Sequence, residues 1–193
     1  MTLSGVIYMV GPSGVGKDSL LNWLRHHVQQ LAPGPDFHFA QRTITRGHDK
    51  SNEAHEAVGL DEFAKLEARG AFALNWQAHG LRYGVRHSQL AQGSGWVIVN
   101  GSREYTEQAR SRVPGLVVLH VSAPEATLRM RLAGRGREDF DQLEARILRA
   151  RYAGLAPATG DLQIINAGAL EETAKLLCVL LQERTGLPLV PAL

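Results

Sequence analysis

The 193-residue sequence contains one cysteine and no long apolar run, and both shortages limit the classes to which it can belong. The single thiol, Cys178, excludes an internal disulfide, and its apolar surroundings predict an inert core residue in a reducing compartment. No apolar run approaches the roughly 20 residues that span a bilayer, so we expect no membrane partner. The opening "MTLSGVIYMVG" lacks a basic segment, which favours a buried first strand over a signal peptide. We therefore expect a cytoplasmic protein.

The sequence also lacks an excess of charge of one sign. Its net charge is +2, too small by itself to indicate a nucleic-acid partner, and we expect none. Lysine is scarce, with 4 residues against 17 arginines. The guanidinium group of arginine is planar and permanently charged, and it can donate two hydrogen bonds to a phosphate group at once. Arginines near loops are therefore candidate phosphate ligands. Codon usage in a GC-rich genome explains the same excess, and the positions of the arginines must decide between these explanations.

The eight histidines do not have the spacing of metal ligands with a supporting carboxylate. His26 and His27 lie in a predicted helix, and His48 and His55 lie in a polar stretch. We interpret them as surface residues or as neighbours of a substrate, not as zinc ligands.

Apolar stretches alternate with amphipathic ones along the chain. Residues 6–10, "VIYMV", show no polar alternation, which is typical of a strand buried on both faces. The same kind of pattern predicts further strands at 37–41, 71–76, 96–100, 116–121 and 162–166, and helices at 17–31, 61–70, 102–112, 124–133, 139–153 and 169–185. This alternation predicts an α/β fold with a parallel sheet flanked by helices.

The chain contains no internal repeat, and we expect a single domain over residues 1–193. Two stretches interrupt the alternation, at about 42–95 and about 133–152, and we expect them to be mobile insertions. The core is then formed by the remaining stretches, at 1–41, 96–132 and 153–193.

A glycine-rich loop follows the first predicted strand, in "MVGPSGVGKDSLL" at residues 9–21. Gly11, Gly16 and Lys17 match the phosphate-binding pattern G-x-x-x-x-G-K-[ST], with a strand before it and a helix after it. Main-chain N–H groups of such a loop, together with the positive end of the helix, bind phosphate, and the lysine reaches the β- and γ-phosphates. The predicted ATP-binding residues are Gly11, Pro12, Ser13, Gly14, Val15, Gly16, Lys17, Asp18 and Ser19.

Asp18 stands where the pattern has Ser or Thr. A carboxylate beside a triphosphate is repelled unless a cation lies between them, and with Mg²⁺ it becomes a hard oxygen ligand. One interpretation is therefore that Asp18 is the metal ligand or holds its water. The other is that Asp18 only stabilises the start of the helix through the dipole, while Ser19 or no protein residue contacts the metal.

The motifs together resemble the guanylate-kinase family of P-loop kinases, over nearly the whole chain and in order. "GPSGVGK" is that family's form of the loop, "TITR" at 43–46 resembles its T-T-R element, and "HGLRYGV" at 79–85 resembles its G-x-Y-Y-G segment. "RLAGRGRED" at 131–139 resembles its arginine-bearing lid, and "IIN" at 164–166 resembles its adenine-side strand end. The resemblance implies a P-loop kinase with an acceptor-binding insertion at about 42–95 and a lid at about 133–152.

The departures from that family concern guanine recognition. Where it has a second arginine and E-x-x-G-x-x-Y, this chain has "GHDKSNEAHEAVGLDEF", and its two guanine-side acids correspond to Gln77 and Asn100. Guanine presents N–H donors that carboxylates accept well, so their loss predicts a poor guanine site. The variant set "GPSGVGKDSL", "ITR", "VNGSR" and "RGRE" is similar to the ribose 1,5-bisphosphate phosphokinases. This implies transfer from ATP to the 1-phosphate of ribose 1,5-bisphosphate, giving phosphoribosyl pyrophosphate in phosphonate breakdown.

The resemblance also assigns roles to individual residues. On the acceptor side, Arg46 matches the family's phosphate-binding arginine, with Arg42 beside it, and Tyr83 matches its tyrosine. Asn100 and Arg103 are candidates because they follow the carboxyl end of a predicted strand, and we add Arg82 and Arg86 as candidates for the second phosphate. Tyr83 either contacts phosphate or packs, and Asn100 is a candidate ligand of sugar hydroxyls. The lid supplies the candidate catalytic arginines Arg131, Arg135, Arg137 and Arg146, which would act with Lys17. Asn166 either binds adenine or caps a turn.

Two alternatives remain open at this point. The first is a guanylate kinase or another nucleoside monophosphate kinase, against which Gln77, Asn100 and the missing tyrosine argue. The second is a non-catalytic guanylate-kinase-like scaffold, against which Lys17 and the lid arginines argue. Whether the protein is a monomer or a homodimer is also open.

Overall fold

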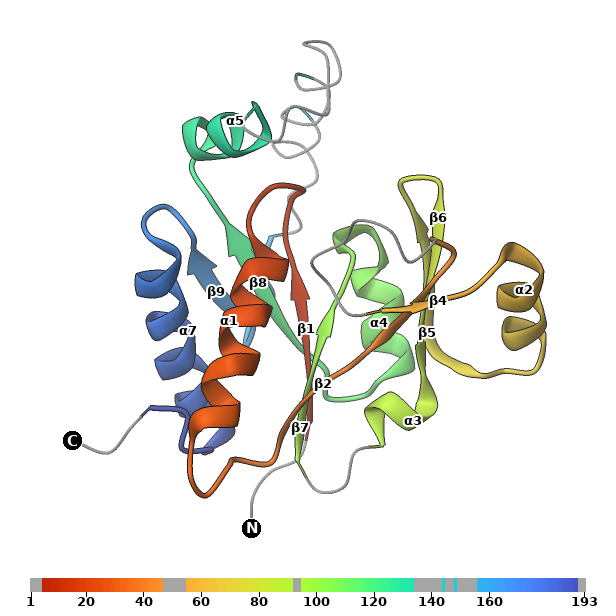
Figure 1. Ribbon diagram of the computed structural model, residues 1–193, viewed down its shortest axis with the longest axis horizontal. Helices are drawn as coiled ribbons and strands as arrows, with labels where there is room; N and C mark the ends of the chain where they lie inside the picture. The colour runs from red at the N-terminus through yellow and green to blue at the C-terminus, as the bar shows by residue number, and fades with distance from the viewer. Residues whose placement is uncertain are drawn as a thin grey trace.

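The computed structural model describes residues 5–46, 55–91, 95–133, 144, 148 and 156–190. Two sheets organise this part of the chain, a parallel one at the centre and a smaller one beside it (Figure 1). The helix predicted at 139–153 and nearly all of the predicted lid lie outside the described residues, as do Arg135, Arg137 and Arg146. Among the described residues, no helix combines the length and the apolar character needed to cross a membrane.

The larger sheet has five strands in the order β2-β7-β1-β8-β9, and every neighbouring pair is parallel. This confirms the predicted parallel sheet. The strands are β1 (Gly5–Val10), β2 (Phe37–Phe39), β7 (Trp96–Asn100), β8 (Val117–Ser122) and β9 (Leu162–Ile165). Since all five run in the same direction, the residues that follow β1 and β7 lie at one edge of the sheet, where ligands of such folds bind.

Both faces of this sheet are covered, which explains the continuous apolar runs in the sequence. Ile7 and Met9 of β1 pack in a core with α1 (Lys17–Gln30) and α7 (Leu170–Thr185), which lie side by side on one face (Figure 1). Tyr8 and Val10 point to the other face, where they pack with Ala109 and with apolar residues of the second sheet. Alternate residues of one strand thus serve two cores.

The remaining helices connect the strands or cover their ends. A 3₁₀ turn, η1 (Arg103–Tyr105), and α4 (Thr106–Arg112) link β7 to β8, and α5 (Glu125–Ala133) follows β8. The short helix α3 (His87–Leu90) precedes β7. Helix α2 (Leu60–Ala68) packs on the second sheet through the apolar cluster Phe63, Leu66 and Phe72.

The second sheet changes the predicted arrangement. It has the order β4-β3-β6-β5 and contains β3 (Arg42–Ile44), β4 (Glu56–Ala57), β5 (Phe72–Ala78) and β6 (Leu81–Arg86). The strand expected at 71–76 belongs to this sheet and not to the parallel one, and β3, β4 and β6 were not predicted. Strands β5 and β6 form a hairpin whose turn, His79–Gly80, has positive φ at both residues (52° and 72°), as in a type I′ turn.

Candidate active site

The loop after β1 presents main-chain donors at the start of α1. Gly16 is the N-cap of the helix with φ of 95°, and as a glycine it has no side chain to cap the first turn. Glycine is required here because a Cβ would also lie 2.6 Å from Nδ2 of Asn166, and at Gly11 a Cβ would lie 2.3 Å from the carbonyl oxygen of Val121. Uncapped N–H groups at a helix N-terminus form an anion-binding site.

Lys17 folds back over this loop. Its Nζ donates hydrogen bonds to the carbonyl oxygens of Gly11, at 2.7 Å, and Pro12, at 3.4 Å. These contacts hold the ammonium group above the main-chain donors, where it can meet an anion bound by the loop.

Asp18 projects from the first turn of α1 toward the end of β7. Asn100, the last residue of β7, donates from Nδ2 to Oδ1 of Asp18 at 2.7 Å. Asn100 is only 5% exposed, so this amide is a fixed partner for an otherwise exposed carboxylate. The donor set fits a hard divalent cation, since Asp18 offers carboxylate oxygen at the phosphate-binding loop. Among the residues described, no group of three or more His, Cys, Asp or Glu side chains is placed to hold a metal by itself.

A pocket of about 360 Å³ opens between the loop and the second sheet. It brings together nine of the residues predicted from the sequence: Gly11, Ser13, Lys17, Asp18, Arg42, Arg46, Tyr83, Asn100 and Arg103. Four of these are cationic, which suits a ligand that carries several phosphates. Six lining residues were not predicted: Trp76, Ala78, His79, Gly101, Ser102 and Glu104. The sequence signal that could have indicated His79 is the pair His79-Gly80, which forms the turn of the hairpin beside the pocket.

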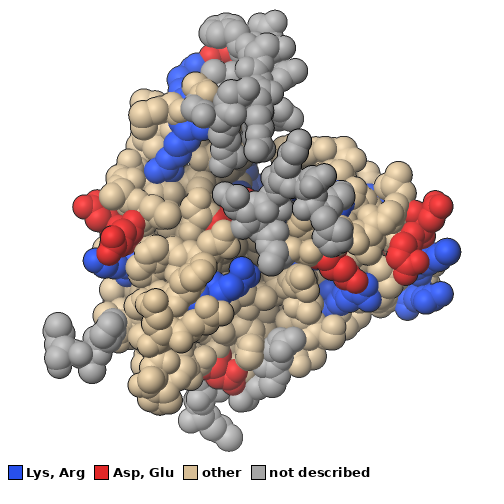
Figure 2. Space-filling model, viewed as in Figure 1, with Lys and Arg blue, Asp and Glu red and all other residues tan. Residues whose placement is uncertain are grey.

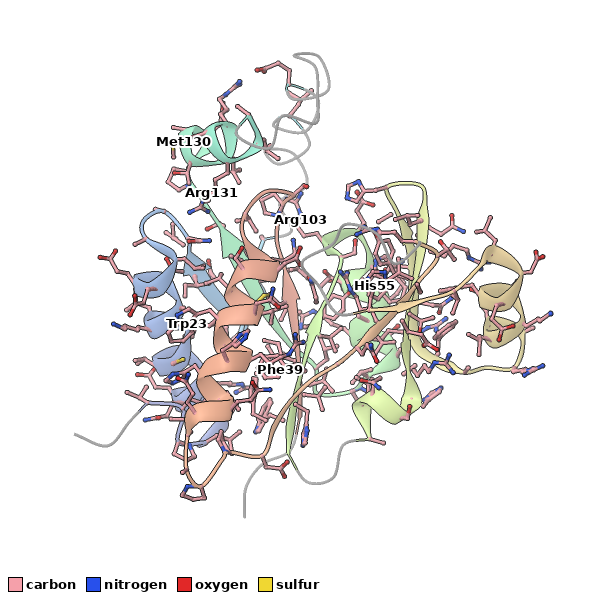
Figure 3. The ribbon with its side chains drawn as sticks, viewed as in Figure 1. Trp23, Phe39, His55, Arg103, Met130 and Arg131 are labelled. Carbon is pink, nitrogen blue, oxygen red and sulfur yellow. The ribbon has the colours of Figure 1, made fainter. Side chains whose placement is uncertain are left out.

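Arg103 enters the pocket from the turn after β7, between the loop and the second sheet (Figure 3). Tyr8 fixes this turn, because its hydroxyl accepts from the N–H of Ser102 at 2.9 Å, and a Cβ at Gly101 would overlap the Tyr8 ring. Burial raises the pKa of Tyr8 and lowers that of Arg103, which Glu104 partly offsets. Arg103 remains a cation because the ordinary pKa of arginine is far above neutral pH.

The opposite wall is a stack of aromatic rings with an arginine on top. The guanidinium of Arg42 lies 5.1 Å from the ring centroid of Tyr83 and donates from Nη1 to the carbonyl oxygen of Asn100 at 3.2 Å. Tyr83 stacks on Trp76 with centroids 5.5 Å apart and planes within 3°, and Trp76 stacks on Tyr105. Arg42 is therefore held by a cation–π contact and a hydrogen bond.

Arg82 and Arg86 do not line the pocket, contrary to the role expected for them. Arg82 is paired with Glu67 and lies over the ring of Phe63. Arg86 makes two hydrogen bonds to Glu56, at 2.6 Å and 2.9 Å. Since each guanidinium is engaged by a carboxylate outside the pocket, Glu67 of α2 or Glu56 of β4, neither arginine belongs to this site.

Gln77, expected beside the acceptor, also points away from it. It is exposed on β5, and its neighbours Trp76 and Ala78 line the pocket instead. Side chains alternate between the two faces of a strand, so the identity of Gln77 carries no information on what the pocket recognises.

Arg131 and Asn166 support the loop from the side away from the pocket. Nδ2 of Asn166 donates to the carbonyl oxygen of Val15 at 2.8 Å, and Nη1 of Arg131 donates to the same oxygen at 3.2 Å. Arg131 also donates to the carbonyl oxygens of Asn166 and Gly168, and it lies below α5 in Figure 3. The side chain of Asn166 is thus engaged by the loop itself, which neither earlier interpretation included.

Charge outside the pocket is mixed. On the face shown in Figure 2, the described Lys and Arg side chains stand in small groups among Asp and Glu, not in one continuous field. The thiol of Cys178 is buried, as expected, and burial raises its pKa to about 11.

The fold and the loop define a class of protein. No family model matches the chain. It is similar to the crystal structure of guanylate kinase from Anaplasma phagocytophilum, with a TM-score of 0.62 and 18% identity over 96% of this chain and 88% of that one. A gluconokinase from Sinorhizobium meliloti aligns with a TM-score of 0.52 and 18% identity over 96% of both chains. The protein has the fold of the P-loop kinases.

Curated relatives narrow this class. The chain is 40% identical over 185 residues to ribose 1,5-bisphosphate phosphokinase PhnN of Burkholderia pseudomallei, covering 94% of this chain and 97% of the relative. It is 39% identical over 189 residues to the protein of that name from Agrobacterium fabrum, covering 94% and 98%. A 43% identical relative from Janthinobacterium is longer, and the chain spans 39% of it. The chain belongs to the ribose 1,5-bisphosphate phosphokinase family.

Proposed function

We propose that the protein transfers the γ-phosphoryl group of ATP to the 1-phosphate of ribose 1,5-bisphosphate, giving phosphoribosyl pyrophosphate and ADP. The observation that supports this most is the convergence of Lys17, Arg42, Arg46 and Arg103 on one pocket beside the phosphate-binding loop. Donor and acceptor together carry five phosphate groups, and such a pair needs cations from several directions. The names of the relatives point to the same reaction.

The acceptor chemistry agrees with what the pocket contains. The attacking atom is a phosphate oxygen that is already ionised near neutral pH, so the reaction needs no general base. Catalysis then depends on in-line placement and on neutralising charge on the transferred group. Lys17 and the loop N–H groups bind the donor phosphates, and Arg42 and Arg46 bind the acceptor phosphate. Arg103 replaces Arg82 and Arg86 as the candidate for the second phosphate of the sugar.

Kinases of this class use ATP and typically a divalent metal, and we propose Mg²⁺ with Asp18 as its protein ligand. A cation at Asp18 would neutralise charge between the carboxylate and the triphosphate. The lid residues Arg135, Arg137 and Arg146 are proposed to close over the γ-phosphate and to exclude water, while Arg131 supports the main chain of the loop. We further propose a cytoplasmic monomer or homodimer that supplies phosphoribosyl pyrophosphate from phosphonate breakdown.

A product assay tests the proposal. The protein is incubated with ATP, Mg²⁺ and ribose 1,5-bisphosphate, and ³¹P NMR follows the two coupled signals of the pyrophosphate group. We expect conversion with the sugar bisphosphate and little with GMP in a parallel reaction. Ready consumption of GMP with no reaction of the sugar would instead establish the nucleoside monophosphate kinase. If the protein failed to bind ATP in the presence of Mg²⁺, the result would favour the alternative that it is a non-catalytic scaffold.

A further inference from the structure

Asn100 is connected to both halves of the site. Its side chain donates to Oδ1 of Asp18, on the donor side, at 2.7 Å. Its main-chain carbonyl oxygen accepts from Nη1 of Arg42, on the acceptor side, at 3.2 Å. It is the last residue of β7, which lies between β2 and β1 in the sheet, and it is 5% exposed. A side chain in this position has little freedom to reorient.

The contact with Asp18 also determines how the amide is oriented. A carboxylate only accepts hydrogen bonds, so the amide nitrogen must face it. Oδ1 of Asp18 is thereby occupied by a charge-assisted hydrogen bond. Asp18 is exposed at the start of α1, and its contact with the buried Asn100 side chain holds it in one rotamer. The second carboxylate oxygen then keeps one direction as well.

We infer that Asn100 is a positioning residue that holds the Asp18 carboxylate for the divalent cation of the bound nucleotide, and that it does not bind the sugar. This rests on the proposed use of Mg-ATP but not on the identity of the acceptor. An amide suits the position better than a carboxylate, since an aspartate in place of Asn100 would put two negative charges at hydrogen-bond distance. The site therefore carries its acid on the helix and its neutral partner on the strand.

The two connections of Asn100 can be separated by mutation. Arg42 is held by the main-chain oxygen, which every substitution at position 100 retains. Asn100→Ala thus removes the support of Asp18 and leaves that of Arg42. If the side chain instead bound sugar hydroxyls, the same substitution would affect the acceptor and not the metal.

The test measures ATP affinity by isothermal titration calorimetry, once with Mg²⁺ and once with EDTA. The ratio of the dissociation constant in EDTA to that in Mg²⁺ is the magnesium gain. We expect Asn100→Ala to lower this gain about ten-fold or more, the usual cost of losing the partner of a metal ligand. The affinity in EDTA and the acceptor KM should stay within about two-fold of the parent values. An unchanged gain with a raised acceptor KM would overturn the inference.

A double-mutant cycle shows whether Asn100 acts through Asp18. In an Asp18→Ala background, Asn100→Ala should cause no further loss of the magnesium gain, because the group that it positions is gone. An equal additional loss would mean that Asn100 acts independently, which contradicts the inference. Asn100→Ser, whose hydroxyl is too short to reach Asp18, serves as a second variant should the alanine variant fold poorly.

Gln77→Ala is the matched control, because it removes an exposed amide from β5 beside the pocket wall without touching the pocket. It should leave the magnesium gain and the acceptor KM unchanged. Since the titrations contain no acceptor, a protein that rejects ribose 1,5-bisphosphate but shows these effects would refute the proposed function alone.

Discussion

Asn166 donates a hydrogen bond from Nδ2 to the carbonyl oxygen of Val15 at 2.8 Å, across 151 positions of sequence. Both residues are buried, and Asn166 follows the edge strand β9. A residue that was expected to meet adenine or to cap a turn is found to hold the main chain of the proposed phosphate-binding loop. The shape of the loop depends on the far end of the domain.

The first prediction follows from that contact. Asn166→Ala should weaken ATP binding about five-fold, because losing one hydrogen bond at the loop costs on the order of 1 kcal/mol and leaves its donors less ordered. Calorimetric titration with Mg-ATP measures the effect. Gln163→Ala, an exposed amide on the same strand, is the control and should bind as the parent does. Parent-like affinity in the Asn166 variant would show that the loop holds its shape without this support.

Lys17→Ala should lower the rate of phosphoryl transfer by about 100-fold or more, while the protein stays folded. The ammonium group donates to the main-chain oxygens of Gly11 and Pro12, and its loss removes positive charge where the phosphates are proposed to bind. The ³¹P assay and a thermal unfolding curve measure the two effects. Full turnover by this variant would refute the assignment of the loop.

Tyr83 should act through its ring and not through its hydroxyl. The ring lies between Arg42 and Trp76, so Tyr83→Phe should keep the acceptor KM within about two-fold, since the stack and the cation–π contact persist. Tyr83→Leu, which loses the aromatic face, should raise the acceptor KM several-fold. Steady-state kinetics at saturating ATP distinguish the two variants. A phenylalanine variant as impaired as the leucine variant would mean that the hydroxyl contacts phosphate.

Stability at acid pH should depend on Asp161. Burial by itself raises the pKa of this carboxyl, but hydrogen bonds from Arg110, His120 and the N–H of Ala158 outweigh it and hold the pKa below its usual value. A carboxyl whose pKa is lower in the folded state contributes stability above its unfolded pKa, of about 3.9, and loses it as pH falls through the folded value.

Asp161→Asn should therefore lower the free energy of unfolding by about 2 kcal/mol at pH 7 and by less at pH 3. Urea unfolding at the two pH values measures the difference. Glu183→Gln, an exposed acid on α7, should show no such pH-dependent difference. An equal loss at both pH values for Asp161→Asn would mean that the carboxylate charge is not what stabilises the cluster.

Local patterns in the sequence predicted the parts of the fold that depend on neighbouring residues. The apolar run of β1, the three glycines and the amphipathic α1 identified the phosphate-binding loop, because strand, turn and helix signals there are contiguous. The spacing of motifs along the chain also indicated the family. The short strands β3 and β4 carry too few residues for a period to be recognised, so the second sheet escaped prediction.

The sequence by itself determined the chemistry that is available: a phosphate-binding loop, an acid at position 18 and an excess of arginine. The tertiary structure decided which of these groups meet. It placed Arg42, Arg46 and Arg103 in the pocket, paired Arg82 and Arg86 with carboxylates elsewhere, and brought Asn100 to Asp18. Such contacts depend on strand order and register between distant segments, and these are set by the packing of the whole core and not by any local pattern.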